Sequence, residues 1–275
     1  DSKNTIKTAL VQMTSGPDIE SNIVEAERWI RAAAGQGAAF ILTPEVTCHR
    51  VSPPKKRLET SPDESAHPML EHFKELAREL DIWLLAGSLS IKKQNQEKVL
   101  NRSFLINNNG KVIVNYDKIH LFDVDLPNGD AYRESDVFAG GQDMVVVEAP
   151  FAKIGLTICY DVRFPYLYRH LAQAGAQIIT VPSAFTVPTG LAHWETLLRA
   201  RAIETGAFVI APAQTGAAEG QRETYGHSLI VAPWGEVLAD AGAEPGIVMA
   251  DLDLSRVDAA RAAIPAWQAK DLLCD

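Results

Sequence analysis

The sequence predicts an α/β fold in which two mixed β-sheets pack face to face, with helices covering them on the outside. Strand and helix patterns alternate in the first third of the chain, whereas tight hairpins join several later strands. Alternation builds parallel pairs and hairpins build antiparallel pairs, so the sheets should be mixed. Many strand segments are apolar on both faces, and the few predicted helices could cover them only if the sheets also cover each other.

The first third of the chain predicts three strands and two helices. Residues 5–12 have the composition of a strand. Residues 18–34 predict an amphipathic helix, because apolar residues recur at three-to-four spacing and glycines follow at 35 and 37. The remaining elements are a buried strand at 38–43 that ends at Pro44, a helix at 68–80 with Pro68 near its start, and a buried strand at 82–91.

The middle of the chain changes character. Residues 99–106 and 111–116 predict two strands, and Asn107-Asn108-Asn109-Gly110 between them is a strong hairpin pattern. The polar stretch 119–142 follows without periodicity, so it is predicted to be a long loop. Such a loop within a compact domain is usually functional or disordered.

The C-terminal half mixes both patterns. Its predicted elements are strands at 144–148 and 153–158, a helix at 165–174, a strand at 177–182, a helix at 190–205, a strand at 207–213, a hairpin pairing 226–232 with 236–239, a strand at 246–252 and a helix at 255–263. No linker, repeat or low-complexity tract interrupts them. We therefore expect a single domain over residues 1–275.

Composition excludes several classes of protein. Of 275 residues, 47% are hydrophobic and 22% charged, as in ordinary soluble proteins. The formal net charge of −9 argues against binding nucleic acid or an anionic membrane, because both need clustered positive charge. No apolar run is long enough to span a membrane, and no targeting signal is recognised at the N-terminus. Three cysteines without a CxxC pair form no disulfide framework, which favours a cytoplasmic protein with reduced thiols.

Several catalytic motifs are missing. The sequence has no phosphate-binding loop, no dinucleotide fingerprint and no HExxH zinc motif. Gly226-His227-Ser228 begins like a serine nucleophile elbow, but Ile230 stands where the final glycine is required. We therefore interpret Ser228 as a strand residue in a hairpin.

Three chemically active residues follow predicted strands. Glu45 follows the strand at 38–43, Lys118 follows the strand at 111–116, and Cys159 lies between the strand at 153–158 and the next helix. In α/β sheets, ligand sites gather at the carboxyl ends of strands, so the three could form one acyl-transfer site. A helix N-terminus beside Cys159 would favour its thiolate. Taken singly, the cysteine could equally be a buried structural residue, and the two charges could be solvated loop residues.

The strings around these residues resemble the nitrilase superfamily of carbon–nitrogen hydrolases. The resemblance rests on Leu42–Glu45, Tyr116–Leu121 and Gly155–Pro165, and it covers essentially the whole chain. Its most similar branch is the Nit-type amidases, the omega-amidase and deaminated-glutathione amidase group. The supporting strings are FDVD at 122–125, ES at 134–135, AHWE at 192–195, RARAIE at 199–204 and YGHS at 225–228. The resemblance implies a nitrilase-like α-β-β-α four-layer sandwich.

The resemblance also implies a mechanism. Cys159 would attack the amide carbonyl and form a thioester, with Glu45 as general base. Lys118 and the backbone N–H of Tyr160 would hold the oxyanion. Glu134 matches a second glutamate of the family, which would orient the substrate amide or assist a proton transfer. The chemistry requires no metal and no organic cofactor.

The implied substrate is a small carboxamide, of the 2-oxo acid amide or deaminated-glutathione type, cleaved to a carboxylate plus ammonia or an amine. Tyr160-Asp161 stands where nitrile-hydrolysing members generally have Trp-Glu, which favours amides over nitriles. An anionic substrate needs a cation, and Arg163 is the candidate, unless it forms a structural ion pair at the helix start. Phe185 and Thr186 would line the pocket or be ordinary loop residues.

Other interpretations stay open from the sequence. The same residues could serve a nitrilase or an N-carbamoyl amidase, or the chain could be a catalytically silent scaffold, although such a protein would be expected to lose part of the triad. The helix at 190–205 and the C-terminal segment resemble dimer contacts of the family, so we expect a homodimer or a larger homo-oligomer. Trp194 and Cys48 are interpreted as packing residues, and Cys274 has no assigned role.

Overall fold

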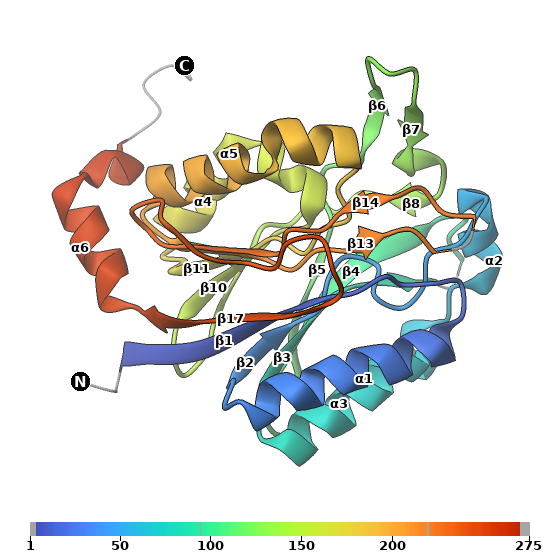
Figure 1. Cartoon of the computed structure of the whole chain (residues 1–275), viewed down its shortest axis with the longest axis horizontal. Coiled ribbons are helices and arrows are strands. Elements are labelled where there is room, and N and C mark those ends of the chain that lie inside the picture. The colour runs from blue at the N-terminus through green and yellow to red at the C-terminus, as the bar shows by residue number, and fades with distance from the viewer. Residues whose placement is uncertain (1–3, 94, 219, 270–275) are drawn as a thin grey trace.

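The computed structural model describes residues 4–93, 95–218 and 220–269. Two sheets pack face to face, with α1 (Ile19–Gly35) and α3 (Pro68–Leu80) outside one sheet and α4 (Pro165–Gln173) and α5 (Val187–Thr205) outside the other (Figure 1). The predicted four-layer sandwich is therefore confirmed. A further helix, α6 (Ser255–Ala263), follows the last strand at one end of the molecule.

The first sheet contains both the first and the last strand of the chain. Its strands, in spatial order, are β17 (Gly246–Asp253), β1 (Thr5–Gln12), β2 (Phe40–Leu42), β3 (Trp83–Ile91), β4 (Val99–Ile106) and β5 (Val112–Asp117), with β8 (Phe138–Ala139) beside β4. The pairs β1–β2 and β2–β3 are parallel, and β3–β4, β4–β5 and β1–β17 are antiparallel. The expected mixture of parallel and antiparallel pairs is present.

The second sheet has the same character. Its strands are β16 (Val237–Asp240), β15 (Leu229–Val231), β12 (Phe208–Ala211), β11 (Ile178–Thr180), β10 (Lys153–Leu156) and β9 (Val145–Glu148). The pairs β10–β11 and β11–β12 are parallel, and the outer pairs are antiparallel. Each strand and helix predicted from the sequence has a counterpart in the structure, with ends that differ by a few residues.

Two layers of apolar side chains explain why so many strands are apolar on both faces. Leu10 and Leu42 of the first sheet join Ile154 and Ile210 of the second in one cluster between the sheets. The neighbours on the same strands point the other way, and Val11 packs with residues of α1 and α3. Burial on both faces removes the polar alternation that a half-exposed strand would carry.

The prediction of an unstructured loop over 119–142 is wrong. This stretch contains a small hairpin, β6 (Asp123–Asp125) with β7 (Ala131–Arg133), and then β8. The turn at Asn128-Gly129 closes the hairpin, with Gly129 at φ +90°. Strands of two or three residues are too short for an alternating pattern to be visible in the sequence. The sequence analysis also missed α2 (Arg57–Thr60) and the pair β13 (Thr215–Gly216) with β14 (Thr224–Tyr225).

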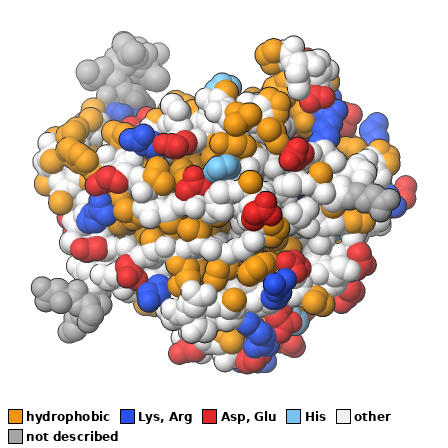
Figure 2. All heavy atoms as spheres, viewed as in Figure 1, with side chains coloured by type: hydrophobic (Ala, Val, Ile, Leu, Met, Phe, Trp, Pro, Cys, Tyr) orange, Lys and Arg blue, Asp and Glu red, His pale blue; other side chains and the backbone are white. Residues whose placement is uncertain are grey.

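Charges of both signs are dispersed over the face seen in Figure 2, with no patch of a single sign. Among the described residues, no helix combines the length and apolar character needed to cross a membrane.

Candidate active site

A cavity of about 530 Å³ opens where several strands end, and the three predicted reactive residues line it. Glu45 lies just beyond β2, Lys118 just beyond β5, and Cys159 beyond β10. The structure therefore brings together residues that are far apart in sequence and belong to both sheets. Glu134, which follows the β6–β7 hairpin, lines the same cavity.

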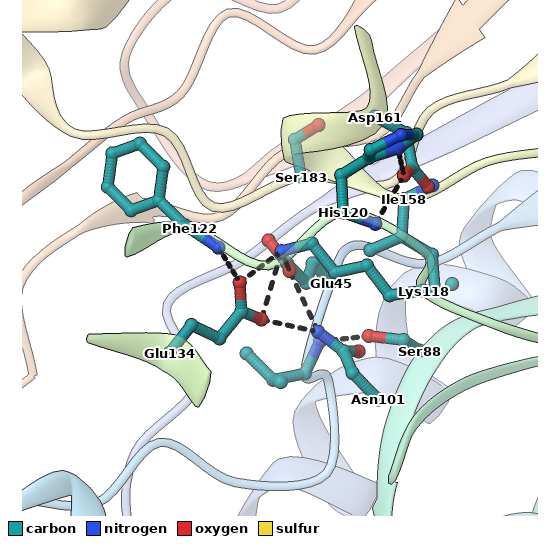
Figure 3. A network of polar contacts seen from close by, with 12 residues as sticks. Glu45, Ser88, Asn101, Lys118, His120, Phe122, Glu134, Ile158, Asp161 and Ser183 are labelled. Carbon is teal, nitrogen blue, oxygen red and sulfur yellow. Dashed lines mark hydrogen bonds and ion pairs between the residues drawn. The ribbon is translucent and has the colours of Figure 1, made fainter. Parts of the chain in front are cut away.

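The Lys118 ammonium lies between two carboxylates (Figure 3). Its Nζ is 2.9 Å from Glu45 Oε1 and 3.0 and 2.9 Å from the two oxygens of Glu134. Asn101 Nδ2 donates to Glu45 Oε1 at 2.9 Å and to Glu134 Oε1 at 3.3 Å. The backbone N–H of Phe122 donates to Glu134 at 2.6 Å. The network thus holds two negative charges and one positive charge in a fixed geometry.

Electrostatics set the resting protonation states. Burial alone would raise the pKa of the Glu45 carboxyl, but Lys118, the Cys159 thiol and Asn101 together hold it below its usual value. Burial would lower the pKa of Lys118, yet Glu134 and Glu45 raise it well above its usual range. Glu45 is therefore a carboxylate and Lys118 an ammonium at neutral pH.

The Cys159 thiol is neutral in this environment, which corrects the expectation of a stabilised thiolate. Burial and the negative charge of Glu45 raise its pKa well above the usual value, while Lys118 lowers it only in part. The ammonium is shared with Glu45 and Glu134, so little of its charge is left for the sulfur. Cys159 itself begins a 3₁₀ turn of five residues, Cys159–Arg163, whose dipole is short, and the helix predicted at 165–174 starts only at Pro165.

The loop that carries Glu45 rests directly on β3. A Cβ on Gly87 would lie 1.8 Å from the carbonyl oxygen of Thr43, so only glycine allows this approach. Ser88 Oγ accepts the N–H of Val46 at 2.8 Å, and Val46 has a φ of +47°. These contacts fix the carboxylate on a tight, strained turn.

The turn that carries Cys159 is held by the buried side chain of Asp161. Cys159 also has a φ of +47°, and its N–H donates to the carbonyl of Pro182 at 2.9 Å. The Asp161 carboxylate accepts the Ile158 N–H at 2.8 Å and the hydroxyl of Tyr116 at 2.7 Å. It also accepts from the His120 N–H at 3.0 Å and lies 2.7 Å from His120 Nδ1 (Figure 3). Asp161 thereby joins the turn after β10 to the segment after β5.

The four residues predicted to contact substrate all line the cavity: Tyr160, Arg163, Phe185 and Thr186. The Phe185 ring packs on Trp194 with centroids 4.7 Å apart, and Thr186 Oγ1 accepts the N–H of Thr189 as the cap of α5. Within the described ranges, no acceptor is bonded to the backbone N–H of Tyr160.

Arg163 has no carboxylate partner among the residues that the structure describes. Its guanidinium lies 5.6 Å from the centre of the Phe185 ring, and its Nη2 is 3.2 Å from His193 Nδ1. The alternative of a structural ion pair at the helix start is therefore wrong. The cation faces a cavity in which no protein anion neutralises it.

The remaining candidates occupy structural positions. Trp194 is buried and donates to the carbonyl of His227, and Cys48 is buried with its sulfur 3.2 Å from His49 Nδ1. Ser228 is buried and hydrogen-bonded to Gln12. Cys274 lies outside the described residues. In the part of the chain that is described, no three His, Cys, Asp or Glu side chains are grouped to hold a metal ion.

Sequence reasoning missed Asn101, Arg50 and Arg57, which also line the cavity. Asn101 gives only a weak indication, a polar residue within an apolar strand pattern. The two arginines lie on the segment after β2, where no periodicity marks them.

Comparison with known proteins decides the family. Residues 7–262 match the carbon–nitrogen hydrolase family. This chain is a carbon–nitrogen hydrolase. Deaminated glutathione amidase from Synechocystis is 40% identical over 263 residues, covering 94% of this hydrolase and 96% of the relative. The enzyme of that name from Homo sapiens is 41% identical over 264 residues, covering 94% and 80%.

Solved structures agree with the fold. The C. elegans NitFhit protein superposes on 98% of this hydrolase with a TM-score of 0.90 and 37% identity, and the hydrolase spans 66% of that chain. Nit3 from Saccharomyces cerevisiae gives a TM-score of 0.86 at 30% identity, covering 95% of both chains. An amidase from Nesterenkonia, at 27% identity and a TM-score of 0.79, was crystallised as a Glu-to-Gln variant with the acetamide moiety of fluoroacetamide on its active-site cysteine. The predictions of the family and of an amide-hydrolysing enzyme are confirmed.

Proposed function

We propose that this hydrolase cleaves a small anionic carboxamide, of the 2-oxo acid amide or deaminated-glutathione type, through a thioester on Cys159. The arrangement of the Glu45, Lys118 and Glu134 charges beside the thiol is the observation that carries the proposal. The named relatives favour this substrate class. The cavity lining favours it too, because it holds six Lys and Arg side chains against two carboxylates in a protein of net charge −9.

In the first half-reaction, the Cys159 sulfur bonds to the carbonyl carbon as its proton moves to Glu45. At reference values of about 4.3 and 8.5, that transfer is uphill by roughly 4 pKa units, or near 6 kcal/mol. The buried thiol makes it steeper, so we expect the proton to leave only as the C–S bond forms. Lys118 and the Tyr160 N–H stabilise the oxyanion, and the unbonded state of that N–H supports this role.

The tetrahedral intermediate then collapses. The C–N bond breaks as Glu45 returns its proton to the departing nitrogen, which leaves the thioester and free ammonia or amine. Glu45 next takes a proton from water as the hydroxide adds to the thioester carbonyl. The C–S bond then breaks, Glu45 returns that proton to the sulfur, and the product leaves as a carboxylic acid that ionises in water. Glu134 holds Lys118 in place through both half-reactions and accepts from the substrate amide.

Ammonia or amine release from a 2-oxo acid amide, the matching nitrile and an N-carbamoyl compound tests the reaction class. We expect turnover of the amide, and intact-mass detection of an acyl adduct on the wild type that is absent from Cys159→Ala. Turnover confined to the nitrile or the N-carbamoyl compound contradicts the amidase proposal. Hydrolysis that survives Cys159→Ala contradicts the mechanism. If no compound is turned over and none forms an adduct, the amidase proposal is contradicted and the interpretation as a catalytically silent scaffold is favoured.

We also propose a homodimer that uses α5, and one catalytic domain over residues 1–275. Ile203 and Trp234 are 53% and 56% exposed, and Ile203 lies against Gly235, the residue that follows Trp234, since a Cβ on Gly235 would meet Ile203 Cδ1 at 2.7 Å. Such adjacent exposed apolar side chains favour a protein partner. The mechanism needs a reduced Cys159, so we place the enzyme in the reducing cytoplasm.

A further inference from the structure

A buried glutamine joins strand ends of the two sheets. Gln214 follows β12 of the second sheet and is fully buried. Its Oε1 accepts the N–H of Ser15 at 2.9 Å, and its Nε2 donates to Ser15 Oγ at 2.7 Å and to the backbone carbonyl of Glu45 at 3.0 Å. Ser15 and Glu45 follow β1 and β2 of the first sheet. The side chain therefore reaches from the second sheet to the loop that carries the Glu45 carboxylate.

These contacts are specific to an amide in one orientation. Both N–H bonds of the Gln214 amide have acceptors, and its oxygen has a donor. The opposite orientation would place Oε1 against the Glu45 carbonyl oxygen and Nε2 against the Ser15 N–H, so each would meet a group of its own kind. Neither a carboxylate nor an apolar side chain of the same length can donate to the Glu45 carbonyl. The contact with the Glu45 loop therefore depends on the amide itself.

The main chain of Gln214 is bonded to the side of the site that carries Cys159. The Gln214 N–H donates to the carbonyl of Ser183 at 2.9 Å, and the Ser183 N–H donates to the carbonyl of Pro212 at 2.9 Å. Pro182, the residue before Ser183, accepts the Cys159 N–H at 2.9 Å. Backbone hydrogen bonds therefore connect Gln214 to the turn of the nucleophile, while its side chain is bonded to the loop of the base.

The Glu45 loop needs such support because its backbone is strained. Val46, the next residue, has a φ of +47°, a conformation that is costly for a β-branched residue. The carbonyls on both sides of Val46 are held: Gln214 donates to that of Glu45, and Ser15 Oγ donates to that of Thr47 at 3.0 Å. Since Gln214 also fixes Ser15, it holds this turn both directly and through the serine.

We propose that Gln214 is a positioning residue that fixes the distance between the Glu45 carboxylate and the Cys159 thiol. Its main chain holds one partner and its side chain holds the other, although the two partners belong to different sheets. A general base must lie within about 2.6–3.2 Å of the group whose proton it takes. A misplacement of about 1 Å can lower the rate by about 10²-fold. The inference rests on the proposed function, in which these two groups exchange a proton.

Gln214→Met tests the inference, because it keeps the length of the side chain and removes its three hydrogen bonds. We expect kcat for the amide to fall by about 30–300-fold, since both half-reactions need the carboxylate in place. KM should change by less than about 3-fold, because Gln214 is not one of the described residues that line the cavity. The measurement is kcat and KM, with urea unfolding of the same variant.

Gln12→Met is the matched control. Gln12 ends β1 and is also fully buried. Its Nε2 donates to the carbonyls of Gly242 and Glu244 at 2.9 and 2.8 Å, and its Oε1 accepts the N–H and the hydroxyl of Ser228, each at 2.8 Å. None of these partners belongs to the Glu45 loop or to the Cys159 turn. This variant should lose at least as much stability as Gln214→Met, with kcat within about 3-fold of the wild type.

Three results overturn the inference. They are a wild-type kcat in Gln214→Met, a loss confined to KM, and an equal loss of kcat in both variants, which would show general destabilisation. If Gln214→Met does not fold, Gln214→Asn decides by the same comparison of kcat with KM, because its shorter amide cannot reach both Ser15 and the Glu45 carbonyl. A wild type without amide turnover contradicts the proposed function instead, whereas each of the three results leaves that function standing.

Discussion

A buried ammonium shared between two carboxylates determines the chemistry of this cavity at the scale of single residues. Lys118 keeps Glu45 ionised, and Glu45 in turn keeps the Cys159 thiol protonated. Base and nucleophile are therefore paired as carboxylate and thiol, so the reaction needs no free thiolate before the substrate arrives. The Asn101 amide also stabilises the two negative charges, because it donates to the carboxylates of Glu45 and Glu134.

Asn101→Ala should shift the pH dependence of activity. The Asn101 amide lowers the pKa of Glu45, so its removal raises that pKa, and the active carboxylate is lost at a higher pH. We expect the acidic limb of kcat/KM to move up by about 1 pH unit, since a hydrogen bond to a charge contributes about 1.5 kcal/mol. The measurement is kcat/KM against pH, which reports the free enzyme.

Asn109→Ala is the control, because Asn109 is exposed in the hairpin turn. It should retain the wild-type profile. An acidic limb that stays in place, or moves down, in Asn101→Ala contradicts the role given to this amide.

At the scale of elements, Asp161 joins a segment of each sheet. It accepts from Tyr116 and His120 around the end of β5 and from Ile158 at the end of β10. The Asp161 carboxylate therefore holds the segment that carries Lys118 at a fixed distance from the turn that carries Cys159, although the two are far apart in sequence.

Asp161→Ala should lower the free energy of unfolding by about 2–5 kcal/mol, because the buried N–H groups of Ile158 and His120 lose their acceptor. Urea unfolding measures this cost. Asp143→Ala, at an exposed site between β8 and β9, should change stability by less than about 0.5 kcal/mol. If both variants cost the same, Asp161 does not join the two segments.

Elements with strong patterns were predictable from the sequence, and elements made by long-range packing were not. The helices at 68–80 and 255–263 have the predicted ends, since proline or apolar spacing marks them locally. The β6–β7 hairpin is too short to carry an alternating pattern. In the site, Glu45, Lys118 and Cys159 were found because they follow strands. Asn101 was missed because its importance comes from contacts with residues on two other segments.

At the scale of the whole molecule, the charge of the cavity lining is opposite in sign to the net charge of the chain. The surface carries charges of both signs, while the cavity lining is cationic within a chain of charge −9 (Figure 2). Recognition of an anion therefore depends on local guanidiniums, and screening by salt should affect the buried ones little.

The molecular mass in solution tests the proposed homodimer. We expect light scattering after size-exclusion chromatography to give twice the mass of one chain, and Ile203→Asp to give the mass of a single chain, because a charge would be buried at the α5 contact. Val24→Asp is the control, since Val24 is 69% exposed on α1, on the opposite side of the sandwich. A wild-type monomer, or dissociation by Val24→Asp alone, contradicts a dimer formed through α5.

The pairing of β1 with β17 has a consequence for biosynthesis. All eight residues of β1 pair with the strand that ends at Asp253 (Figure 1). At ribosomal rates of about 5–20 residues per second, roughly 10–50 s pass between synthesis of the two strands. During that time the nascent chain carries β1 as an open, apolar strand edge, the kind of surface that chaperones protect and that aggregates when they are scarce.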